Sequence, residues 1–518
     1  MKLNNLIWAA IAAALSVQST PTPEFNTIEA RLDEAARIGI RLNLTQACTR
    51  LQQQFSTRLY LPGSAVYDYE TTTRYWTAVD YSTPACVFVP KEPSEISLFV
   101  QVVRLLNVKF AIRGGGHMPI PLYNNADSNG ILLSTSNLTT LSISSDKNTL
   151  SVGPGRRWRE VADYLASYGK AAVGGRVGKV GVPGLILGGG ISFYSSQYGW
   201  GSDSVVKFQC VLASGQLIEA TATNNYSDLF WALKAGGNSF CLVTRFDIKV
   251  YNSPSVWVGI AQYDASNREE YLNAVYTFGA FGSQDPKSAI VPTIIMAPAA
   301  GLTLYAATKF YDSPTLSPTV FQNFTAPVLT PLIDTITYQP LNDYLAQTDP
   351  LQPDALRQKF RTLTFVVNKD AVTYIHDTFT TRINELAAIP GVGASMTFQP
   401  ITKNMLQAGA NSGGNPIGLD ANNGPYFAVV LNWNWLNAAD DAAVSTFASG
   451  ITAQLEAGLQ SRGVSVGFRY LNDADKDQLV FQNYGAANLA KLKSVRSKYD
   501  SARVFTDLMP GGWKVAAA

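Results

Sequence analysis

The sequence predicts an α+β protein with two domains, and three observations support this fold class. The chain has 518 residues, 46% of them hydrophobic and 15% charged, so it can bury more than one core. Helical and strand periodicities alternate from about residue 90 to residue 252. After residue 254 the glycine clusters stop and longer strand-like stretches begin. This change indicates a second α+β domain with an antiparallel sheet and covering helices.

The charge balance and the rare residue types exclude several classes of function. Forty Lys and Arg residues against thirty-eight Asp and Glu residues leave a net charge of +2. A nucleic-acid-binding protein needs a clear basic excess, so we predict no nucleic-acid partner. With two histidines and four cysteines, we also predict no metal centre. No stretch beyond the first twenty residues is apolar for the roughly twenty residues that a membrane span needs, so we predict no membrane anchor.

The first nineteen residues have the pattern of a secretory signal. Lys2 precedes an apolar run over residues 6–15, and small residues follow. We expect cleavage near residues 16–20 and a secreted or lumenal protein; a buried N-terminal helix is the alternative. Four sequons agree with export as possible glycosylation sites. Their asparagines are Asn43, Asn137, Asn225 and Asn323.

The four cysteines allow three pairings, and their positions favour one disulfide. Cys48 and Cys86 precede the first strong motif, in a turn-rich region that a bridge would stabilise. Cys210 and Cys241 lie in apolar runs, where free thiols are commonly buried. We therefore predict a Cys48–Cys86 disulfide.

The elements of the N-terminal half follow from their periodicities. An amphipathic helix is expected around residues 28–40, and a second helix begins at Pro93. The strand at 108–112 runs directly into Arg113-Gly114-Gly115-Gly116-His117. The remaining elements are expected as strands at 131–133, 150–152 and 246–250, helices at 158–165 and 228–233, and a hairpin of 208–212 with 217–220.

The second half of the chain alternates long strands with helices. Strands are expected at 289–295, 302–310 and 427–431, and helices at 374–386 and 439–459. A last helix is expected over 479–498, before Pro510-Gly511-Gly512. Four aromatic residues of this half would suit a hydrophobic substrate, although aromatic side chains are more often part of a core. They are Tyr426, Phe427, Trp433 and Trp435.

Glycine is concentrated in five clusters within about eighty residues. The clusters lie at 114–116, 153–155, 174–175, 178–184 and 188–190. Glycine lets a backbone approach a ligand closely and present a row of N–H groups, which suits a pyrophosphate. The fingerprints of a Rossmann dinucleotide site and of a P-loop are both absent from the sequence. A single cluster would indicate a tight turn, but five together favour a cradle for a phosphate-bearing cofactor.

The glycine motifs resemble the flavin-binding domain of berberine bridge enzyme-like oxidases, of the vanillyl-alcohol oxidase/p-cresol methylhydroxylase superfamily. The resemblance begins with Arg113-Gly114-Gly115-Gly116-His117 and the run from Gly174 to Gly190. It continues through Tyr198-Gly199, Asp203-Ser204-Val205, Ser227-Asp228-Leu229-Phe230-Trp231-Ala232, Gly236-Gly237-Asn238, Tyr470-Leu471-Asn472, Tyr484-Gly485 and Pro510-Gly511-Gly512. It covers residues 80–252 and 465–515 well and the middle loosely, and the closing segment is similar to fungal members.

The resemblance implies how the chain is divided and how it holds FAD. A two-part FAD-binding domain of p-cresol methylhydroxylase type would comprise residues 20–253, with a core of about 80–252, and residues 471–518. Residues 254–470 would form the substrate domain. His117 matches the histidine that is attached to the flavin 8α-methyl group. Val177 stands where many relatives have a second attachment through cysteine, so a single covalent link is expected.

Several further positions match the cofactor site of the family. They are Arg113, Gly114, Gly115, Gly116, Met118, Gly175, Gly178, Val180, Gly181, Gly184, Gly188, Gly189, Gly190, Tyr198, Val243 and Asn472. In relatives, valine at the Val180 position accompanies reoxidation by O2, because it leaves room for a diatomic molecule near the flavin.

The catalytic residues are expected among oxygen acids, because His117 is used for the cofactor and His376 lies in a helical stretch without a motif. Tyr470-Leu471-Asn472-Asp473 matches the Tyr-x-Asn-Tyr of relatives, except that Asp473 replaces the second tyrosine. Asp473 could act as a base if burial raised its pKa, or it could be a solvated acid. We predict an acid–base set of Tyr470 with Asp473 or Tyr198.

The predicted function is a secreted FAD-dependent oxidase. It would remove hydride from a small organic substrate, such as an alcohol, an amine or a secondary-metabolite intermediate, and pass the electrons to O2 to give H2O2. A flavin dehydrogenase that uses another acceptor, a flavin-containing cyclase, a sugar oxidase and a flavin-free binding protein are the alternatives.

Overall fold

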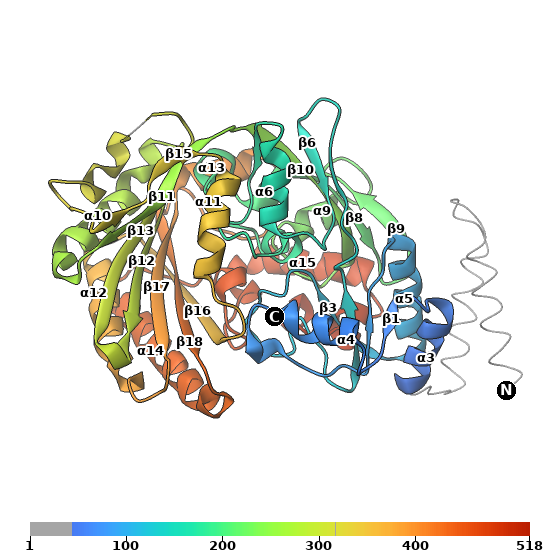
Figure 1. The fold of residues 1–518 in the computed structure, drawn as a ribbon. Coiled ribbons are helices and arrows are strands. Elements are labelled where there is room, and N and C mark those ends of the chain that lie inside the picture. Colours follow the sequence, from blue (N-terminus) through green and yellow to red (C-terminus); the bar gives the residue numbers. More distant parts are fainter. Residues whose placement is uncertain (1–43, 316) are drawn as a thin grey trace, which may run out of the picture.

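The computed structural model describes residues 44–315 and 317–518, which form an α+β protein with three sheets (Figure 1). The expected signal segment, the helix at 28–40 and Asn43 lie outside the described residues. The described N-terminal part and the nine-stranded sheet lie side by side, with α11 between them in the view of Figure 1. No helix among the described residues is long and apolar enough to cross a membrane.

The first sheet has four strands, in the order β1-β2-β4-β3. Its strands are β1 (Leu59–Tyr60), β2 (Cys86–Phe88), β3 (Lys109–Arg113) and β4 (Gly130–Ser134). β2, β4 and β3 run parallel, and α5 (Pro93–Leu106) connects β2 to β3. This helix begins at Pro93, as the sequence predicts, and ends at Asn107, whose left-handed backbone (φ 51°) closes it. The Cys48–Cys86 disulfide ties α3 (Leu44–Gln54) to β2, which confirms the predicted pairing.

The second sheet is antiparallel, in the order β5-β6-β10-β8-β9, with β7 paired to β10. Its strands are β5 (Leu141–Ile143), β6 (Thr149–Val152), β7 (Lys170–Ala172), β8 (Val205–Val211), β9 (Leu217–Ala220) and β10 (Leu242–Asn252). β8 and β9 form the predicted hairpin, and Gly215 takes the positive φ of +88° that its turn requires. The other helices of this half of the chain are α4 (Ala65–Asp68), whose Tyr67 packs against the first sheet, α6 (Trp158–Ala166), α7 (Val182–Leu187), α8 (Ser195–Tyr198) and α9 (Ser227–Leu233).

The third sheet has nine antiparallel strands, in the order β14-β11-β13-β12-β17-β18-β16-β19, with β15 paired to β11. They are β11 (Val256–Tyr263), β12 (Ser288–Ala297), β13 (Leu302–Tyr311), β14 (Ile333–Asp334), β15 (Thr337–Gln339), β16 (Arg357–Val366), β17 (Gly393–Ile401), β18 (Tyr426–Trp435) and β19 (Ser465–Val466). α10 (Arg268–Phe281), α12 (Lys369–Arg382) and α14 (Asp441–Ser461) share a buried core with one face of this sheet. The other two helices of this part are α11 (Leu341–Thr348) and α13 (Lys403–Asn411).

The four aromatic residues considered for the substrate site are core residues. Phe427, Trp433 and Trp435 are buried in the core under α12 and α14, and Tyr426 is buried at the start of β18. The C-terminal helix also differs from its prediction. α15 spans Ala486–Tyr499 and not 479–498, because Gly485 takes a φ of +90° that separates it from a short 3₁₀ turn. Leu492 of this helix and the segment that follows it are buried in the same core as the first two sheets.

Candidate active site

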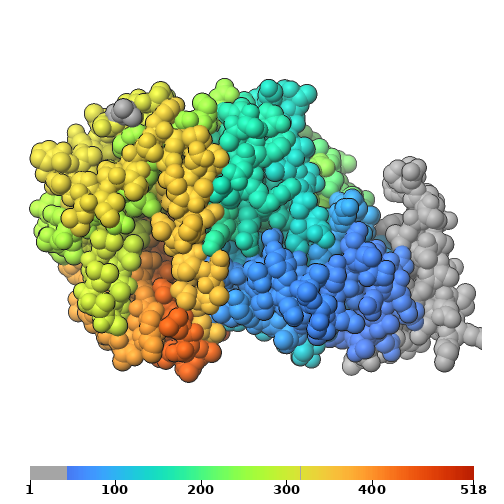
Figure 2. Space-filling model, in the orientation of Figure 1, coloured from blue at the N-terminus to red at the C-terminus, as the bar shows by residue number. Residues whose placement is uncertain are grey.

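A cavity of about 610 Å³ lies between the glycine loops and the free face of the nine-stranded sheet. Figure 2 shows the two parts of the chain in contact along the seam where residues of α11 meet the N-terminal half. The sheet side is built from alternate residues of its strands, since side chains point to one face with a period of two. They are Ile260 and Gln262, Val291, Thr293 and Ile295, Ala306 and Thr308, Ser395, Thr397 and Gln399, and Val430 and Asn432.

The loop side of the cavity carries most of the positions that the sequence assigns to FAD. Those lining it are Gly114, Gly115, Gly116, His117, Met118, Gly175, Val180, Gly181, Gly184, Gly188, Val243 and Asn472. Tyr470 and Asp473 line the same cavity, which places the predicted cofactor and catalytic residues together.

The loops approach each other so closely that only glycine fits at several positions. A Cβ atom on Gly115 would lie 2.4 Å from the Cα of Gly181, and one on Gly188 would lie 2.1 Å from the Oδ1 of Asn472. Gly184, in contrast, has open space around the position of a Cβ. This close packing brings backbone rather than side chains to the cavity wall, which is the surface that a dinucleotide needs.

Five of the predicted cofactor positions do not line the cavity, and four of them are Arg113, Gly178, Gly189 and Gly190. Arg113 is fully buried beneath the loop and pairs with Glu70, so it supports the loop from behind. Gly178 donates its N–H to Asp349 at 2.8 Å. Gly189 and Gly190 form the turn after α7, with φ values of +101° and +87°. These residues shape the site without facing a ligand.

Tyr198 is a further correction, because its side chain does not reach the cavity. It ends the short helix α8, and its ring stacks on that of Tyr251 with a centroid distance of 3.6 Å. This contact with β10 fixes the phenol in the packing around α8. Tyr198 therefore does not join Tyr470 and Asp473.

His117 presents a neutral imidazole to the cavity. Its ring stacks on Trp76, with centroids 4.2 Å apart and planes 5° from parallel. Burial, and then the nearby charge of Arg157, lower the pKa of His117 to about 3. The Nε2 atom is buried and has no hydrogen-bond partner among the described residues. A buried polar atom without a partner is rare in proteins, so this nitrogen fits a site that a cofactor completes.

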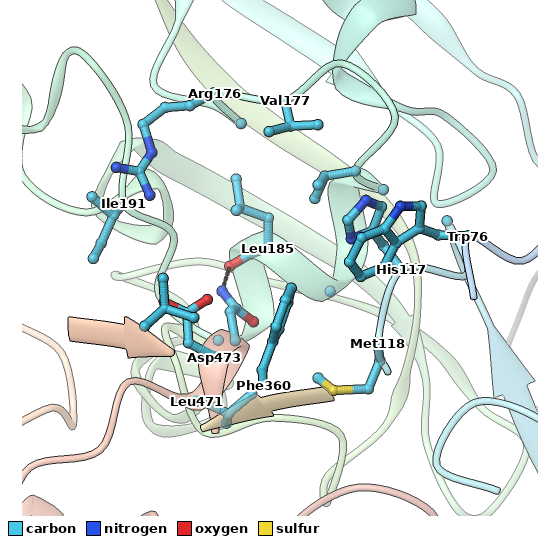
Figure 3. Close-up of a pocket in the computed structure, with 18 of the residues that line it drawn as sticks. Trp76, His117, Met118, Arg176, Val177, Leu185, Ile191, Phe360, Leu471 and Asp473 are labelled. Atoms are coloured by element: carbon cyan, nitrogen blue, oxygen red, sulfur yellow. Dashed lines mark hydrogen bonds between the residues drawn. The ribbon is translucent and has the colours of Figure 1, made fainter. Parts of the chain in front are cut away.

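Asp473 lies on another side of the cavity, where a chain of polar contacts holds its carboxylate. The Nε2 of Gln399 donates to Asp473 Oδ2 at 2.6 Å, and the guanidinium of Arg176 donates to the Oε1 of Gln399. Figure 3 shows Arg176, Ile191 and Asp473 on one side and Trp76 and His117 on the other. Burial raises the pKa of Asp473 to about 6, against the lowering effects of Gln399 and Arg176. This carboxyl group can therefore exchange a proton near neutral pH.

Tyr470, unlike Asp473, keeps its proton at neutral pH. Its hydroxyl oxygen accepts hydrogen bonds from the Ile191 N–H at 2.9 Å and from the Nδ2 of Asn472 at 3.0 Å. Asn472 also donates to the carbonyl of Leu185 at 3.1 Å. Burial, and then the nearby charge of Asp473, raise the pKa of Tyr470 to about 12. The phenol remains protonated at neutral pH, so it is suited to donate a hydrogen bond and not to act as the base.

Sequence reasoning did not assign three residues that shape this site. Trp76 stacks on His117 from a segment without a motif. Gln399 is 223 residues from its partner Arg176, so no local pattern connects them. Arg176 stands inside the glycine run, and a charged side chain among these glycines was the one sequence feature that could have indicated a role in the site.

The comparisons with known proteins agree with this geometry. A family model for an FAD binding domain matches residues 84–221. An FAD-dependent monooxygenase of Penicillium roqueforti is 35% identical over 90% of this chain and 93% of its own length. The bifunctional solanapyrone synthase of Alternaria solani is 31% identical over 90% of this chain and 89% of its own length.

Solved structures show the same fold at lower identity. A carbohydrate oxidase from Microdochium nivale matches with a TM-score of 0.74 and 19% identity, over 90% of this chain and 99% of that one. A berberine bridge enzyme-like protein of Physcomitrella patens matches with a TM-score of 0.72 and 17% identity, over 90% and 99%.

Together, the cavity, the glycine loops and the FAD-binding match define an FAD-dependent oxidoreductase. The chain belongs to a family of fungal FAD-dependent oxidoreductases, and it has the fold of berberine bridge enzyme-like proteins.

Proposed function

We propose that the protein is a secreted FAD-dependent oxidase that acts on a small organic substrate, with FAD attached through His117 alone. The observation that carries this proposal is one cavity lined by a neutral, unpartnered imidazole and by a carboxyl group with a pKa of about 6. FAD-binding residues would come from residues 44–253 and 471–518, and the substrate would lie against the sheet of residues 254–470.

The residues of the chain supply distinct parts of the reaction. Bound FAD supplies the chemistry of hydride acceptance. The neutral imidazole of His117 has a lone pair available for a bond to carbon, whereas Val177 has no thiol for a second link. Asp473 takes the proton that the hydroxyl or amine group of the substrate loses, and Tyr470 donates a hydrogen bond to the substrate. Gln399 holds the carboxylate in place.

The cavity walls support an oxidase whose substrate has both apolar and polar groups. Val180 lines the cavity, where a small side chain leaves room for O2. The sheet side combines apolar side chains, such as Ile260, Val291 and Val430, with a larger number of neutral polar ones, such as Gln262, Thr293 and Asn432, which suits a substrate that has both apolar and polar groups. O2 would take the two electrons with two protons to give H2O2.

Three features of the chain support secretion. The Cys48–Cys86 disulfide is typical of an oxidising compartment. The asparagines of two predicted sequons, Asn137 and Asn225, are exposed, and Asn323 is partly exposed. The N-terminal apolar run would direct the export.

Peroxide yield and oxygen labelling test the proposal against its alternatives. The purified protein should have a flavin absorption spectrum and release one H2O2 for each product molecule in a screen of small alcohols and amines. With isotopically labelled O2, an oxidase leaves the label in peroxide, whereas a monooxygenase places one labelled atom in the product. Label in the product, or reduced flavin that persists in air, would refute the oxidase assignment.

A further inference from the structure

Arg176 is an unusual residue in this cavity because its charge has no direct counter-ion. Its guanidinium has five N–H donors, and its hydrogen bond to the described residues goes from Nη2 to the Oε1 of Gln399. No carboxylate of the described residues lies within ion-pair distance of it, and Asp473 is reached only through Gln399. Burial lowers the pKa of Arg176, which reflects the cost of holding its charge here.

The surroundings make this cation the strongest attraction for an anion in the cavity. Arg176 and Asp473 are the only lining residues of the described chain with acidic or basic side chains besides His117. The neighbouring walls are apolar or neutral, including Ile191, Phe193 and Tyr344. A guanidinium in such a setting pairs most strongly with a planar oxyanion, which can accept two parallel hydrogen bonds.

We propose that Arg176 binds an anionic oxygen of the substrate, so that the substrate class is a small organic acid, either a carboxylate or an ionised enol. This inference rests on the proposed function, because it assumes that the cavity receives the substrate of the oxidase.

Gln399 explains how a substrate anion and a catalytic carboxylate can share one cavity. The amide oxygen of Gln399 accepts from Arg176 while its amide nitrogen donates to Asp473, so the two charged neighbours fix the orientation of the amide. The amide separates the carboxylate from the guanidinium and leaves the other N–H donors of Arg176 for a ligand. Figure 3 shows Arg176 and Asp473 on the same side of the cavity, so an anion held by Arg176 would place the rest of the molecule beside the base.

The test compares an acid with its neutral analogue on the purified holoenzyme. Binding of cinnamate and of cinnamamide is measured by calorimetry at neutral pH, where cinnamate is ionised. The variants are Arg176→Gln, which removes the charge, and Arg176→Lys, which retains it without the planar fork. Lys179→Gln is the matched control, because Lys179 carries the same charge three residues away but pairs with Asp354 and does not line the cavity.

We expect cinnamate to bind the wild type about tenfold to a hundredfold more tightly than cinnamamide, since hydrogen bonds to charged groups have this strength. Arg176→Gln should remove this preference, Arg176→Lys should retain part of it, and Lys179→Gln should leave it unchanged. Equal affinities for the two probes in the wild type would overturn the inference, as would equal losses in Arg176→Gln and Lys179→Gln.

A second readout separates Arg176 from a role in holding FAD. The flavin content and absorption spectrum of Arg176→Gln should match those of the wild type. Loss of flavin together with an equal loss of affinity for both probes would overturn the inference. Oxidation of neutral substrates without any preference for acids would leave the proposed oxidase intact and refute the role of Arg176. Binding of acids without any peroxide release would leave the role of Arg176 intact and refute the oxidase.

Discussion

Replacing Asp473 with asparagine should slow the reaction and stabilise the fold in the same protein. The variant keeps an oxygen that can accept from Gln399, so the contact at 2.6 Å can persist. It removes the ability to take a proton. Loss of a general base slows the chemical step by about 10²–10⁴-fold. With a substrate in hand, stopped-flow measurement of anaerobic flavin reduction gives this rate directly.

The stability effect follows from the raised pKa of Asp473. In the folded protein this pKa is about 6, against an ordinary value of 3.8 for an aspartate side chain. At 1.36 kcal/mol for each tenfold change in acidity, the difference corresponds to about 3 kcal/mol. A raised carboxyl pKa stabilises the fold below pH 3.8, and this contribution is lost as the pH rises through 6. We compare the unfolding free energy of Asp473→Asn with that of the wild type at each pH. As the pH rises from 4 to 7, this difference should shift in favour of the variant by up to about 3 kcal/mol.

Two pH series test this reasoning. The rate of flavin reduction in the wild type should rise with pH through about 6, as Asp473 becomes ionised, and the variant should lack this rise. Denaturant unfolding of both proteins gives the stability difference at each pH. Asp477→Asn is the control, because Asp477 is exposed, pairs with Arg361 and does not line the cavity. Wild-type reduction rates in Asp473→Asn, or an unchanged stability difference across the pH range, would refute the role of Asp473.

Three further predictions concern other parts of the structure. Replacing Cys48 and Cys86 by serine opens a loop of 38 residues and should lower the free energy of unfolding by about 3–4 kcal/mol. Two free thiols in unreduced peptide maps of the wild type would exclude the bridge. Val180→Leu should slow reoxidation of the reduced flavin by O2 several-fold without changing anaerobic reduction, and an unchanged reoxidation rate would remove its role in oxygen access. Tyr470→Phe leaves two donors, the Ile191 N–H and the Nδ2 of Asn472, without the hydroxyl that accepts from them, so it should destabilise the fold by about 1–3 kcal/mol. It should slow flavin reduction less than Asp473→Asn does. A larger kinetic loss would make Tyr470 the principal proton acceptor.

The sequence predicted correctly those elements whose ends are set by capping and turn residues close to them in the chain. The helix that starts at Pro93 and the hairpin around Gly215 have capping and turn residues that act within a few positions. The helix expected from residue 479 shows the limit of this approach. Its apolar periodicity continues across Gly485, but the positive φ of that glycine begins a new helix there.

The candidate site was predictable where the glycine motifs supply it and not where distant segments meet. The residues from Gly114 to His117 stand in one motif and line the cavity together. Tyr198 also stands in a motif, yet its ring stacks on Tyr251, a contact between helix and sheet that the sequence does not encode locally. Gln399 joins Arg176 to Asp473 across the domain seam, and only the tertiary structure brings these three together.

The covalent link between FAD and His117 is the central feature of the proposed oxidase. Peptide mass analysis of the acid-denatured wild type should find the peptide that contains His117 heavier by the mass of one FAD less two hydrogens, with yellow colour retained by the polypeptide. His117→Ala should release its flavin on denaturation, whereas Trp76→Phe, which retains an aromatic ring beside the imidazole, should keep the link. An unmodified His117 peptide in the wild type, or colour that stays with the polypeptide in His117→Ala, would contradict the account.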